Sequence, residues 1–506
     1  MATFLVGFVW RAYIEPSDGF SVLPYLALRA FYLPMLGFYV FQQSTKWGPV
    51  LGPALTGFLS CHVGIIASAY AIADALEVFD LAGKYGWAWG IGLPALAADL
   101  ALFKPLDAGI SYLLPLASTF TSAFTPVKVQ LLIASTYAMI SPKKPYWMFT
   151  LAIPAVVHAF FANPHFDSPR NVGVLNKALQ PLNWTMLDRQ WSNTGYLSVL
   201  ESLDMQYRVL RCDHSLLGGE WLLTDERRKE EGWLVNEPIY AVFAMLEAVR
   251  LLEVESPVPD SAAQALVVGL GIGTAPKAFM AHGINTTVIE LDPVVHQLAT
   301  QYFDLPSEHT AILQDAVTWV DSAAVVGTQR YDYIVHDVFT GGAEPLQLFT
   351  DKFLADLRSL LQPNGVVAIN YAGDLKLPLT GRILNTINQA FDQQCKIFRD
   401  TMPVESDSAG TPEDFLNLVV FCRNTPGRIT FRQSTTSDFL GSKSRRHYLV
   451  PRADHEINFP LDAQTHRSAI LHAGEESHWS RQQAESGIRH WHIMRKVLPA
   501  AVWELW

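Results

Sequence analysis

Cysteine is scarce in this chain of 506 residues, and its scarcity excludes two kinds of stabilising site. The four cysteines are Cys61, Cys212, Cys395 and Cys422; they lie far apart, and no two of them form a CxxC pair. Structural zinc sites and disulfide frameworks both depend on characteristic cysteine spacings. We therefore predict neither, and we expect the cysteines to be small buried hydrophobic residues.

Charged residues are also few, at 17% of the chain, and the net charge is −11. A protein that binds nucleic acid usually carries a basic patch or an excess of positive charge, so this balance excludes nucleic acid as an expected partner. The sequence contains no internal repeat and no long low-complexity tract. The shortage of charge is concentrated in the first 165 residues, which sets this region apart from the rest.

Apolar runs in this N-terminal region predict a transmembrane helical domain over residues 1–165. A helix needs roughly 20 apolar residues to cross a bilayer, and the run Val50–Ala73 has that length without a charged residue. About five spans are expected, from the runs Val22–Gln42, Val50–Ala73, Tyr85–Phe103, Ala108–Val127 with Val129–Ile140, and Tyr146–Ala162. We therefore expect an integral, multi-pass protein of an internal membrane such as the endoplasmic reticulum. The alternative is a buried helical domain of a soluble protein.

The stretch from Ala265 to Asp292 has the pattern of a nucleoside-binding α/β unit. An apolar run leads into Gly269, Gly271 and Gly273, and the next apolar run ends at Glu290. Glycines permit positive φ and close approach of a ligand, and the helix that follows presents free N–H groups. An acid about 20 residues after the first glycine can accept hydrogen bonds from ribose hydroxyls. Two classes remain open: dinucleotide enzymes and S-adenosylmethionine (SAM) enzymes.

Strands and helices alternate through residues 256–430, which predicts a parallel, doubly wound, Rossmann-like sheet. Asp315 and Ala316 follow one predicted strand and Asp337 follows the next, at the edge where such sheets bind ligands. The full expectation is an α/β fold in which a linker and small β-region over 166–255 precede this sheet. Gly218-Gly219 is expected to form a hairpin turn in that region. A partly helical tail over 431–506 is expected to pack on the catalytic domain or to lie on a bilayer.

The order of the motifs GLGIGT, VIELDP, QDAVTWV, YDYIVHDVF and LLQPNGVVAIN resembles the spermidine/spermine synthase family within the class I SAM-dependent transferases. The resemblance implies that SAM or decarboxylated SAM is the cofactor, bound by the glycine turn. It implies that Glu290 holds the ribose and that Asp315 reaches the adenine amino group, with Ala316 packing nearby. It also implies that Asp337 lies beside the reacting centre and takes a proton from the nucleophile.

Two departures from the family argue against simple spermidine synthesis. Ile272 stands where family members carry an aspartate, and Tyr240-Ala241-Val242 replaces their Tyr-His-Glu motif. Polyamines are polycations, and they need several carboxylates to replace their hydration. We therefore favour methyl transfer to a hydrophobic small molecule. The alternatives are aminopropyl transfer from decarboxylated SAM and a non-catalytic nucleoside-binding membrane protein.

The catalytic candidates are Asp337, as a general base or an orienting group, and Tyr240, for which a core position is an equal alternative. Asn370 and Tyr371 are candidates for closing the pocket, whereas His336 is expected to point away from it because adjacent strand residues face opposite sides. The expected partners are an apolar small-molecule acceptor, membrane lipid and a second copy of the chain in a homodimer. No metal site is expected, and the catalytic domain is expected in the cytosol because SAM is made there.

Overall fold

The computed structural model describes residues 28–32, 35, 79–87, 126–140, 146–163, 166, 168–213, 215–327, 329–338, 344–400, 415–459 and 470–504. The chain divides into two units, Met1–Ala178 with Trp506 and Leu179–Leu505. The first unit contains the helices α5 (Leu81–Trp87), α8 (Pro126–Ile140) and α9 (Tyr146–Phe161) and most of α10 (Pro169–Leu179). The second unit contains every strand that the described residues form.

The transmembrane prediction is wrong for the residues that the structure describes. None of the helices in the described ranges is long and apolar enough to span a membrane. Among the described helices of the first unit, α9 is the longest, with 16 residues, and it contains Pro154. At about 1.5 Å per residue it extends about 24 Å, less than the roughly 30 Å of a bilayer's hydrocarbon core. The predicted span Val50–Ala73 lies outside the described residues, as do most of Tyr85–Phe103, Ala108–Val127 and Val22–Gln42. For the residues that the structure describes, the predictions of a transmembrane domain and of an integral multi-pass membrane protein are therefore wrong.

A five-stranded antiparallel sheet opens the second unit, and its strands follow one another in chain order. The strands are β1 (Trp184–Trp191), β2 (Tyr196–Ser202), β3 (Tyr207–Cys212), β4 (Ser215–Trp221) and β5 (Glu237–Pro238). Gly218 and Gly219 lie inside β4 and pair with β3, so the predicted hairpin turn there is wrong. The glycines serve packing, because a Cβ on Gly218 would press against the side chain of Ile272.

The larger sheet has eight strands in the order β13-β11-β12-β10-β9-β6-β7-β8. Its strands are β6 (Gln264–Val268), β7 (Asn285–Glu290), β8 (Thr310–Leu313), β9 (Tyr331–His336), β10 (Leu361–Asp374), β11 (Cys395–Arg399), β12 (Phe415–Arg423) and β13 (Glu456–Ile457). The five strands β8, β7, β6, β9 and β10 run parallel, as predicted. The three at the other edge are antiparallel, so the sheet is mixed and not wholly parallel.

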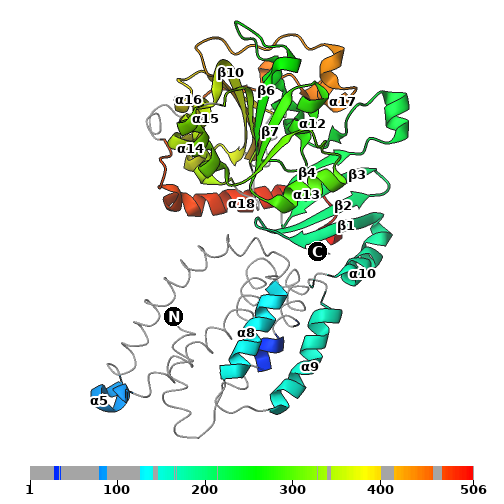
Figure 1. Cartoon of the computed structure of the whole chain (residues 1–506), viewed down its shortest axis with the longest axis vertical. Helices are drawn as coiled ribbons and strands as arrows, with labels where there is room; N and C mark the ends of the chain where they lie inside the picture. Colours follow the sequence, from blue (N-terminus) through cyan, green and yellow to red (C-terminus); the bar gives the residue numbers. More distant parts are fainter. Residues whose placement is uncertain are drawn as a thin grey trace, which may run out of the picture. The chain divides into compact units, whose positions relative to one another are not determined.

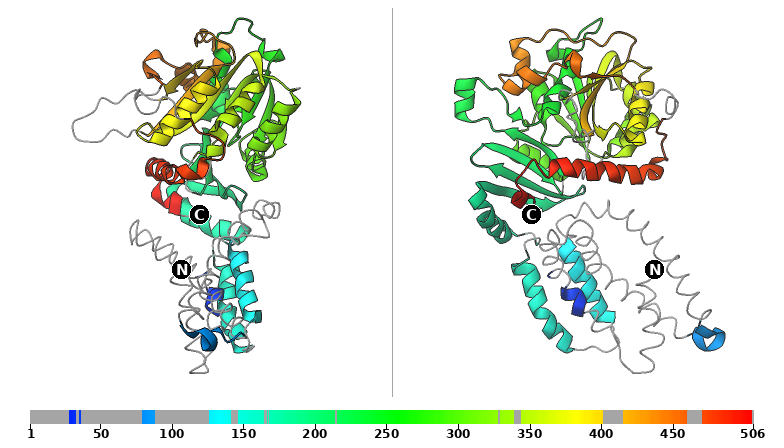
Figure 2. Two further views of the ribbon diagram at one scale, coloured as in Figure 1. Left: turned by 90° about the vertical axis from the view of Figure 1, so that its left-hand side faces the viewer. Right: turned by 180° about the vertical axis from the view of Figure 1, so that it is seen from behind.

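Helices cover both faces of this sheet, which makes it a doubly wound α/β fold (Figure 1). One apolar cluster joins the sheet to α11 (Ala241–Leu246), α12 (Thr274–Ala281) and α13 (Pro293–Tyr302). A second joins the opposite face to α14 (Ala316–Val326), α15 (Asp351–Ser359) and α16 (Pro378–Ala390). The C-terminal helix α18 (Ser480–Met494) contacts β10 and β4, and Figure 2 shows it beside the sheets from two sides. This part of the tail therefore packs on the catalytic unit, which is one of its two predicted placements.

A buried ion pair joins helix α12 to the smaller sheet. Lys277 of α12 pairs with Glu220 of β4, and the Lys277 ammonium also donates to the carbonyl of Phe303 at 2.7 Å. Replacing Lys277 with methionine would leave the Glu220 carboxylate buried without its counter-charge. We expect the free energy of unfolding in urea to fall by about 3–5 kcal/mol.

The matched control for this change is Lys352→Met, because Lys352 pairs with Asp321 and Asp356 on an exposed surface. Surface pairs contribute at most about 1 kcal/mol, so this variant should unfold almost like the wild type. Equal losses of stability in the two variants would contradict the assigned role of the buried pair.

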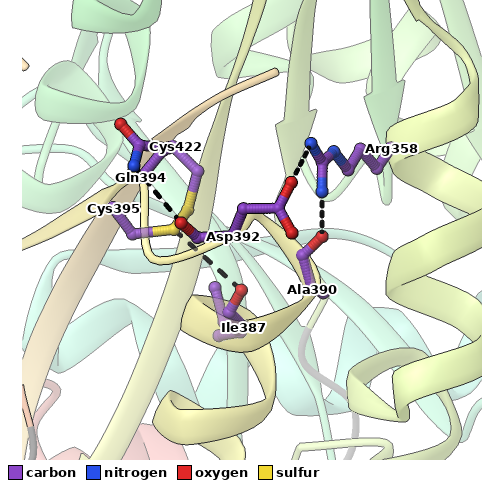
Figure 3. Close-up of a disulfide and its surroundings, with 7 residues drawn as sticks. All are labelled: Arg358, Ile387, Ala390, Asp392, Gln394, Cys395 and Cys422. Atoms are coloured by element: carbon purple, nitrogen blue, oxygen red, sulfur yellow. Dashed lines mark hydrogen bonds and ion pairs between the residues drawn. A yellow bond between two sulfur atoms is a disulfide. The ribbon is translucent and has the colours of Figure 1, made fainter. Parts of the chain in front are cut away.

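A disulfide links Cys395 of β11 to Cys422 of β12, which corrects the prediction that the cysteines are only buried hydrophobic residues (Figure 3). The two residues are direct partners in the antiparallel register of these strands. Their separation of 27 residues in the chain hides this pairing from any local motif. Cys212 is buried, as predicted, and Cys61 lies outside the described residues.

Candidate functional site

A cavity of about 730 Å³ opens at the carboxyl ends of the parallel strands. That volume falls within the range of small-molecule and cofactor sites. Its wall contains all but one of the predicted site residues: Gly269, Gly271, Glu290, Asp315, Ala316, Asp337 and Tyr240. The exception is Gly273, which lies at the start of α12 with a φ of 79° and forms the N-cap of that helix. The structure thus gathers the predicted residues around one space, while their individual roles stay predictions.

The backbone of the glycine turn lies in close contact with two other segments, the residues after β9 and strand β4. Gly269 has a φ of 86°, and a Cβ there would collide with the carbonyl oxygen of Asp337. Gly271 has a φ of 53°, and a Cβ there would collide with the carbonyl oxygen of Leu217 in β4. Only glycine combines these positive φ values with such close approach of backbone. The turn therefore fixes the position of Asp337 as well as offering its own backbone to a ligand.

The carboxylate of Glu290 is held by backbone N–H groups at the end of β7. One oxygen accepts from Leu270 at 2.9 Å and the other accepts from Asp292 at 2.8 Å. Burial raises the pKa of Glu290 to about 7, although these two hydrogen bonds oppose the rise. Each carboxylate oxygen has two acceptor sites, so both retain capacity for the hydroxyls of a ribose.

Asp315 forms the N-cap of α14. Its Oδ2 atom accepts from the backbone N–H of Thr318 at 2.9 Å and from the Thr318 hydroxyl at 2.7 Å. Capping a helix in this way is a common structural role for a carboxylate at the end of a strand. Asp315 also lines the cavity, however, and so does its neighbour Ala316. The capping bonds use one oxygen, so the second oxygen remains available to a donor such as an adenine amino group.

Asp337 follows β9 and faces the cavity beside the glycine turn. Its backbone N–H donates to the carbonyl of Val268 at 2.9 Å, and its Oδ1 atom accepts from the Nδ2 of Asn370 at 2.7 Å. The side chain opens on the cavity, but the surrounding protein excludes bulk water and raises its pKa to about 6, against the effect of the Asn370 bond. A carboxylate with this pKa is ionised at neutral pH and basic enough to accept a proton.

The three aromatic or imidazole side chains considered in the sequence analysis differ in whether they reach the cavity. Tyr240 lines the cavity, and burial raises the pKa of its hydroxyl, which therefore stays protonated. His336 is buried and its Nε2 lies 3.0 Å from the carbonyl of Leu348, so it points away from the cavity as predicted. Tyr371 is buried in the core, where its hydroxyl donates to Glu344 at 3.0 Å, so it does not close the pocket. Asn370 does line the cavity.

Part of the cavity wall comes from segments that the motifs do not mark. The loop between β1 and β2 contributes Asn193 and Thr194. The Thr194 hydroxyl donates to the carboxylate of Asp292, two residues after Glu290, at 2.7 Å. The C-terminal helix α18 contributes His490 and Met494. These residues have no local signature, because their place in the site follows only from contacts between distant parts of the chain.

Polar contacts hold α18 over this edge of the sheet. The Gln483 side chain donates to the carbonyl of Glu344 at 2.6 Å, and Ser486 donates to the Glu344 carboxylate at 3.2 Å. Arg489 forms an ion pair with the buried Asp374 at the end of β10. The C-terminal helix is therefore part of the site and not an appendage.

Comparison with known proteins gives one similarity over nearly the whole chain. The N-terminal histidine N-methyltransferase of Emericella nidulans is 39% identical over 520 residues, which covers 99% of this chain and 90% of that protein. A polyamine aminopropyltransferase of Vibrio vulnificus is 35% identical over 146 residues, which covers 28% of this chain and 47% of that protein. No protein-family model matches the chain.

Among solved structures, a probable spermidine synthase from Corynebacterium glutamicum is similar with a TM-score of 0.41 and 15% identity, covering 57% of this chain and 96% of that one. The similarity over the whole chain is to a methyltransferase, whereas the sequence similarity to the aminopropyltransferase is confined to part of the chain.

Proposed function

This chain belongs to the family of the Emericella nidulans N-terminal histidine N-methyltransferase and is a SAM-dependent methyltransferase, and from that premise we propose that it methylates a nitrogen of a histidine at the start of a polypeptide. The observation that carries the proposal is the similarity over 99% of the chain. We propose the N-terminal histidine as the acceptor in place of the apolar small molecule expected from the sequence. A homodimer and the exclusion of nucleic acid stay predictions.

SAM is the cofactor, and the cavity residues fit it. The glycine turn brings backbone to the cavity, the buried Glu290 offers acceptor oxygens for the ribose, and Asp315 retains one oxygen for the adenine amino group. When bound, SAM supplies a methyl group on a sulfonium, which is already a good leaving group. The protein therefore contributes mainly alignment and proton transfer.

The acid content of the cavity supports methyl transfer over aminopropyl transfer. Ile272, at the position where the resembled family has an aspartate, is buried and packs against Gly218 of β4. Ala241 and Val242 open α11 where that family has a histidine and a glutamate. The carboxylates on the described cavity wall are those of Glu290, Asp315 and Asp337, which the cofactor and the proton transfer would use. A polyamine would otherwise meet apolar side chains such as Phe243, Leu216 and Met494, which cannot replace its hydration. An imidazole ring or a single amine makes no such demand.

Proton removal is the step that falls to the chain's own residues. An α-ammonium group must lose a proton before its nitrogen can attack. An imidazole attacks through its free lone pair and then releases a proton from its other nitrogen. In either case a nitrogen–methyl bond forms as the sulfur–methyl bond breaks, S-adenosylhomocysteine leaves, and one proton goes to a base. Asp337 is the base we propose, since it faces the cavity and is ionised at neutral pH.

The proposed acceptor is tested with peptides that differ only at their first residue. The purified chain is incubated with SAM and either a peptide that begins with histidine or the same peptide with alanine first, and the products are sequenced by mass spectrometry. We expect a methyl group on the first residue of the histidine peptide and none on the alanine peptide. An N-acetylated histidine peptide shows which nitrogen is used, because acetylation blocks only the α-amine. Equal methylation of the alanine peptide, or none of either peptide, would overturn the proposed acceptor.

SAM affinity should fall as the pH falls through neutrality. Glu290 accepts ribose hydroxyls best as a carboxylate, and burial raises its pKa to about 7. Protonation below that pH removes the charged acceptor, so we expect the calorimetric dissociation constant to rise about tenfold from pH 8 to pH 6. The control is Glu290→Gln, which should bind more weakly and without this pH dependence. If the dissociation constant of the variant depended on pH as strongly as that of the wild type, the pH dependence would come from a group other than Glu290.

A further inference from the structure

Two polar atoms on the cavity wall have no hydrogen-bond partner within the described part of the chain, although both are buried. They are the hydroxyl of Tyr240 and the Oδ1 atom of Asn370. Buried polar atoms in proteins are nearly always hydrogen-bonded, so an unpaired one on a residue that lines a ligand cavity points to a ligand as its partner. The Asn370 atom is the more informative of the two, because it adjoins the carboxylate of Asp337.

The orientation of the Asn370 amide is fixed by its neighbours. Its Nδ2 atom donates to Oδ1 of Asp337 at 2.7 Å. An ionised carboxylate only accepts hydrogen bonds, so the amide nitrogen must face Asp337 and the amide oxygen must face away from it. The backbone is equally fixed, because Asn370 pairs with Val419 of β12 and its neighbour Ile369 pairs with His336 of β9.

We propose that Asn370 is a positioning residue for methyl transfer: its amide nitrogen holds the carboxylate of Asp337 toward the acceptor, and its amide oxygen accepts a hydrogen bond from an N–H group of that acceptor. The inference rests on the proposed function and names a residue that serves it. An N-terminal histidine has N–H groups on both its amine and its ring, so either end can supply the donor. In this arrangement the carboxylate of Asp337 and the amide oxygen of Asn370 both accept hydrogen bonds from N–H groups of the N-terminal histidine.

The hydrogen bond from Asn370 also affects proton transfer. It stabilises the charged form of Asp337 and so lowers the pKa of that carboxyl, against the larger effect of burial. The other titratable groups on the described cavity wall are Cys212, Tyr240, Glu290, Asp315 and His490, and the pKa shift of Asp337 arises from burial and the Asn370 bond. Removing the donor should raise the pKa of Asp337. The acidic limb of the pH–rate profile, where the base becomes protonated, should then move to higher pH.

The test compares Asn370→Leu and Asn370→Asp with Asn417→Leu. Asn417 is a matched control because it lines the same cavity from β12 but bonds to Asp400 instead of Asp337. For each variant, kcat and KM for the histidine-first peptide are measured across pH, and the SAM dissociation constant is measured by calorimetry. Asn370→Asp keeps the side-chain size and places a second carboxylate beside Asp337, which should raise the pKa of Asp337 further than leucine does.

We expect Asn370→Leu to lower kcat about 10- to 100-fold, the range for a lost hydrogen bond to a charged group. The acidic limb should move upward in both Asn370 variants and stay in place in Asn417→Leu, with SAM affinity unchanged in all three. An unmoved limb in the Asn370 variants, or a loss of SAM binding parallel to the loss of kcat, would overturn the proposal while leaving the proposed function intact. A wild-type chain that does not methylate the peptide would overturn both.

Discussion

Replacing Asp337 with asparagine is expected to lower kcat for the histidine-first peptide by about 10²- to 10⁴-fold, the usual contribution of a positioned general base. The asparagine keeps the size of the side chain and can still accept from Asn370, so the cavity should retain its shape. Because Asp337 is not among the residues assigned to the ribose or adenine, SAM affinity should stay within about threefold of the wild type. Single-turnover kinetics and calorimetry measure the two quantities separately.

The control for this experiment is Asp332→Asn. Asp332 lies in β9, the strand that Asp337 follows, but its carboxylate accepts from the backbone N–H of Gln264 at 2.9 Å and does not line the cavity. Wild-type kcat is expected for this variant. If Asp337→Asn retained full turnover as well, Asp337 would be a structural carboxylate and the base would have to be sought elsewhere.

Replacing Gly269 with alanine is expected to abolish SAM binding and to destabilise the catalytic unit. The alanine must adopt a φ of 86°, which costs about 1–2 kcal/mol, and its Cβ must displace the carbonyl of Asp337, which adds about 1–3 kcal/mol. Since the same movement shifts both the glycine turn and Asp337, the loss of binding should exceed what the loss of stability explains. Urea unfolding and calorimetry give the two values.

Gly283→Ala separates backbone strain from collision. Gly283 has a φ of 81°, nearly that of Gly269, but a Cβ there has no neighbour within 4 Å. It should lose only about 1–2 kcal/mol of stability and bind SAM normally. If the two alanine variants lost the same stability and bound SAM equally well, the close approach of Asp337 to the glycine turn would not be needed for SAM binding.

The sequence predicts the part of the site that belongs to the parallel strands. Gly269, Glu290, Asp315 and Asp337 follow successive strands, and the carboxyl ends of parallel strands meet at one edge of a sheet. Periodicity and turn residues therefore suffice to place them together. The same argument does not reach His490, which joins the cavity only because a helix more than 100 residues after the last parallel strand packs across that edge.

Two of the wrong predictions, the hairpin turn and the absence of a disulfide, share a physical cause, because both were drawn from local sequence patterns alone. Gly218-Gly219 is a common turn signal, but here it lies within a strand and makes room for Ile272 of the glycine turn. Wide spacing between Cys395 and Cys422 argued against a disulfide, yet antiparallel pairing of β11 with β12 places the two side by side. In both cases pairing between strands determines the outcome, and no local window contains that information.

The most direct test of the account compares two donors on one acceptor. The chain is incubated with the histidine-first peptide and either SAM or decarboxylated SAM, and the intact peptide mass is recorded. We predict a gain of one methyl group with SAM and no aminopropyl product with the decarboxylated donor, because Ile272 and Val242 stand where the resembled family has the acids that bind the amines. Aminopropyl transfer to the peptide or to putrescine, without methyl transfer from SAM, would contradict the account.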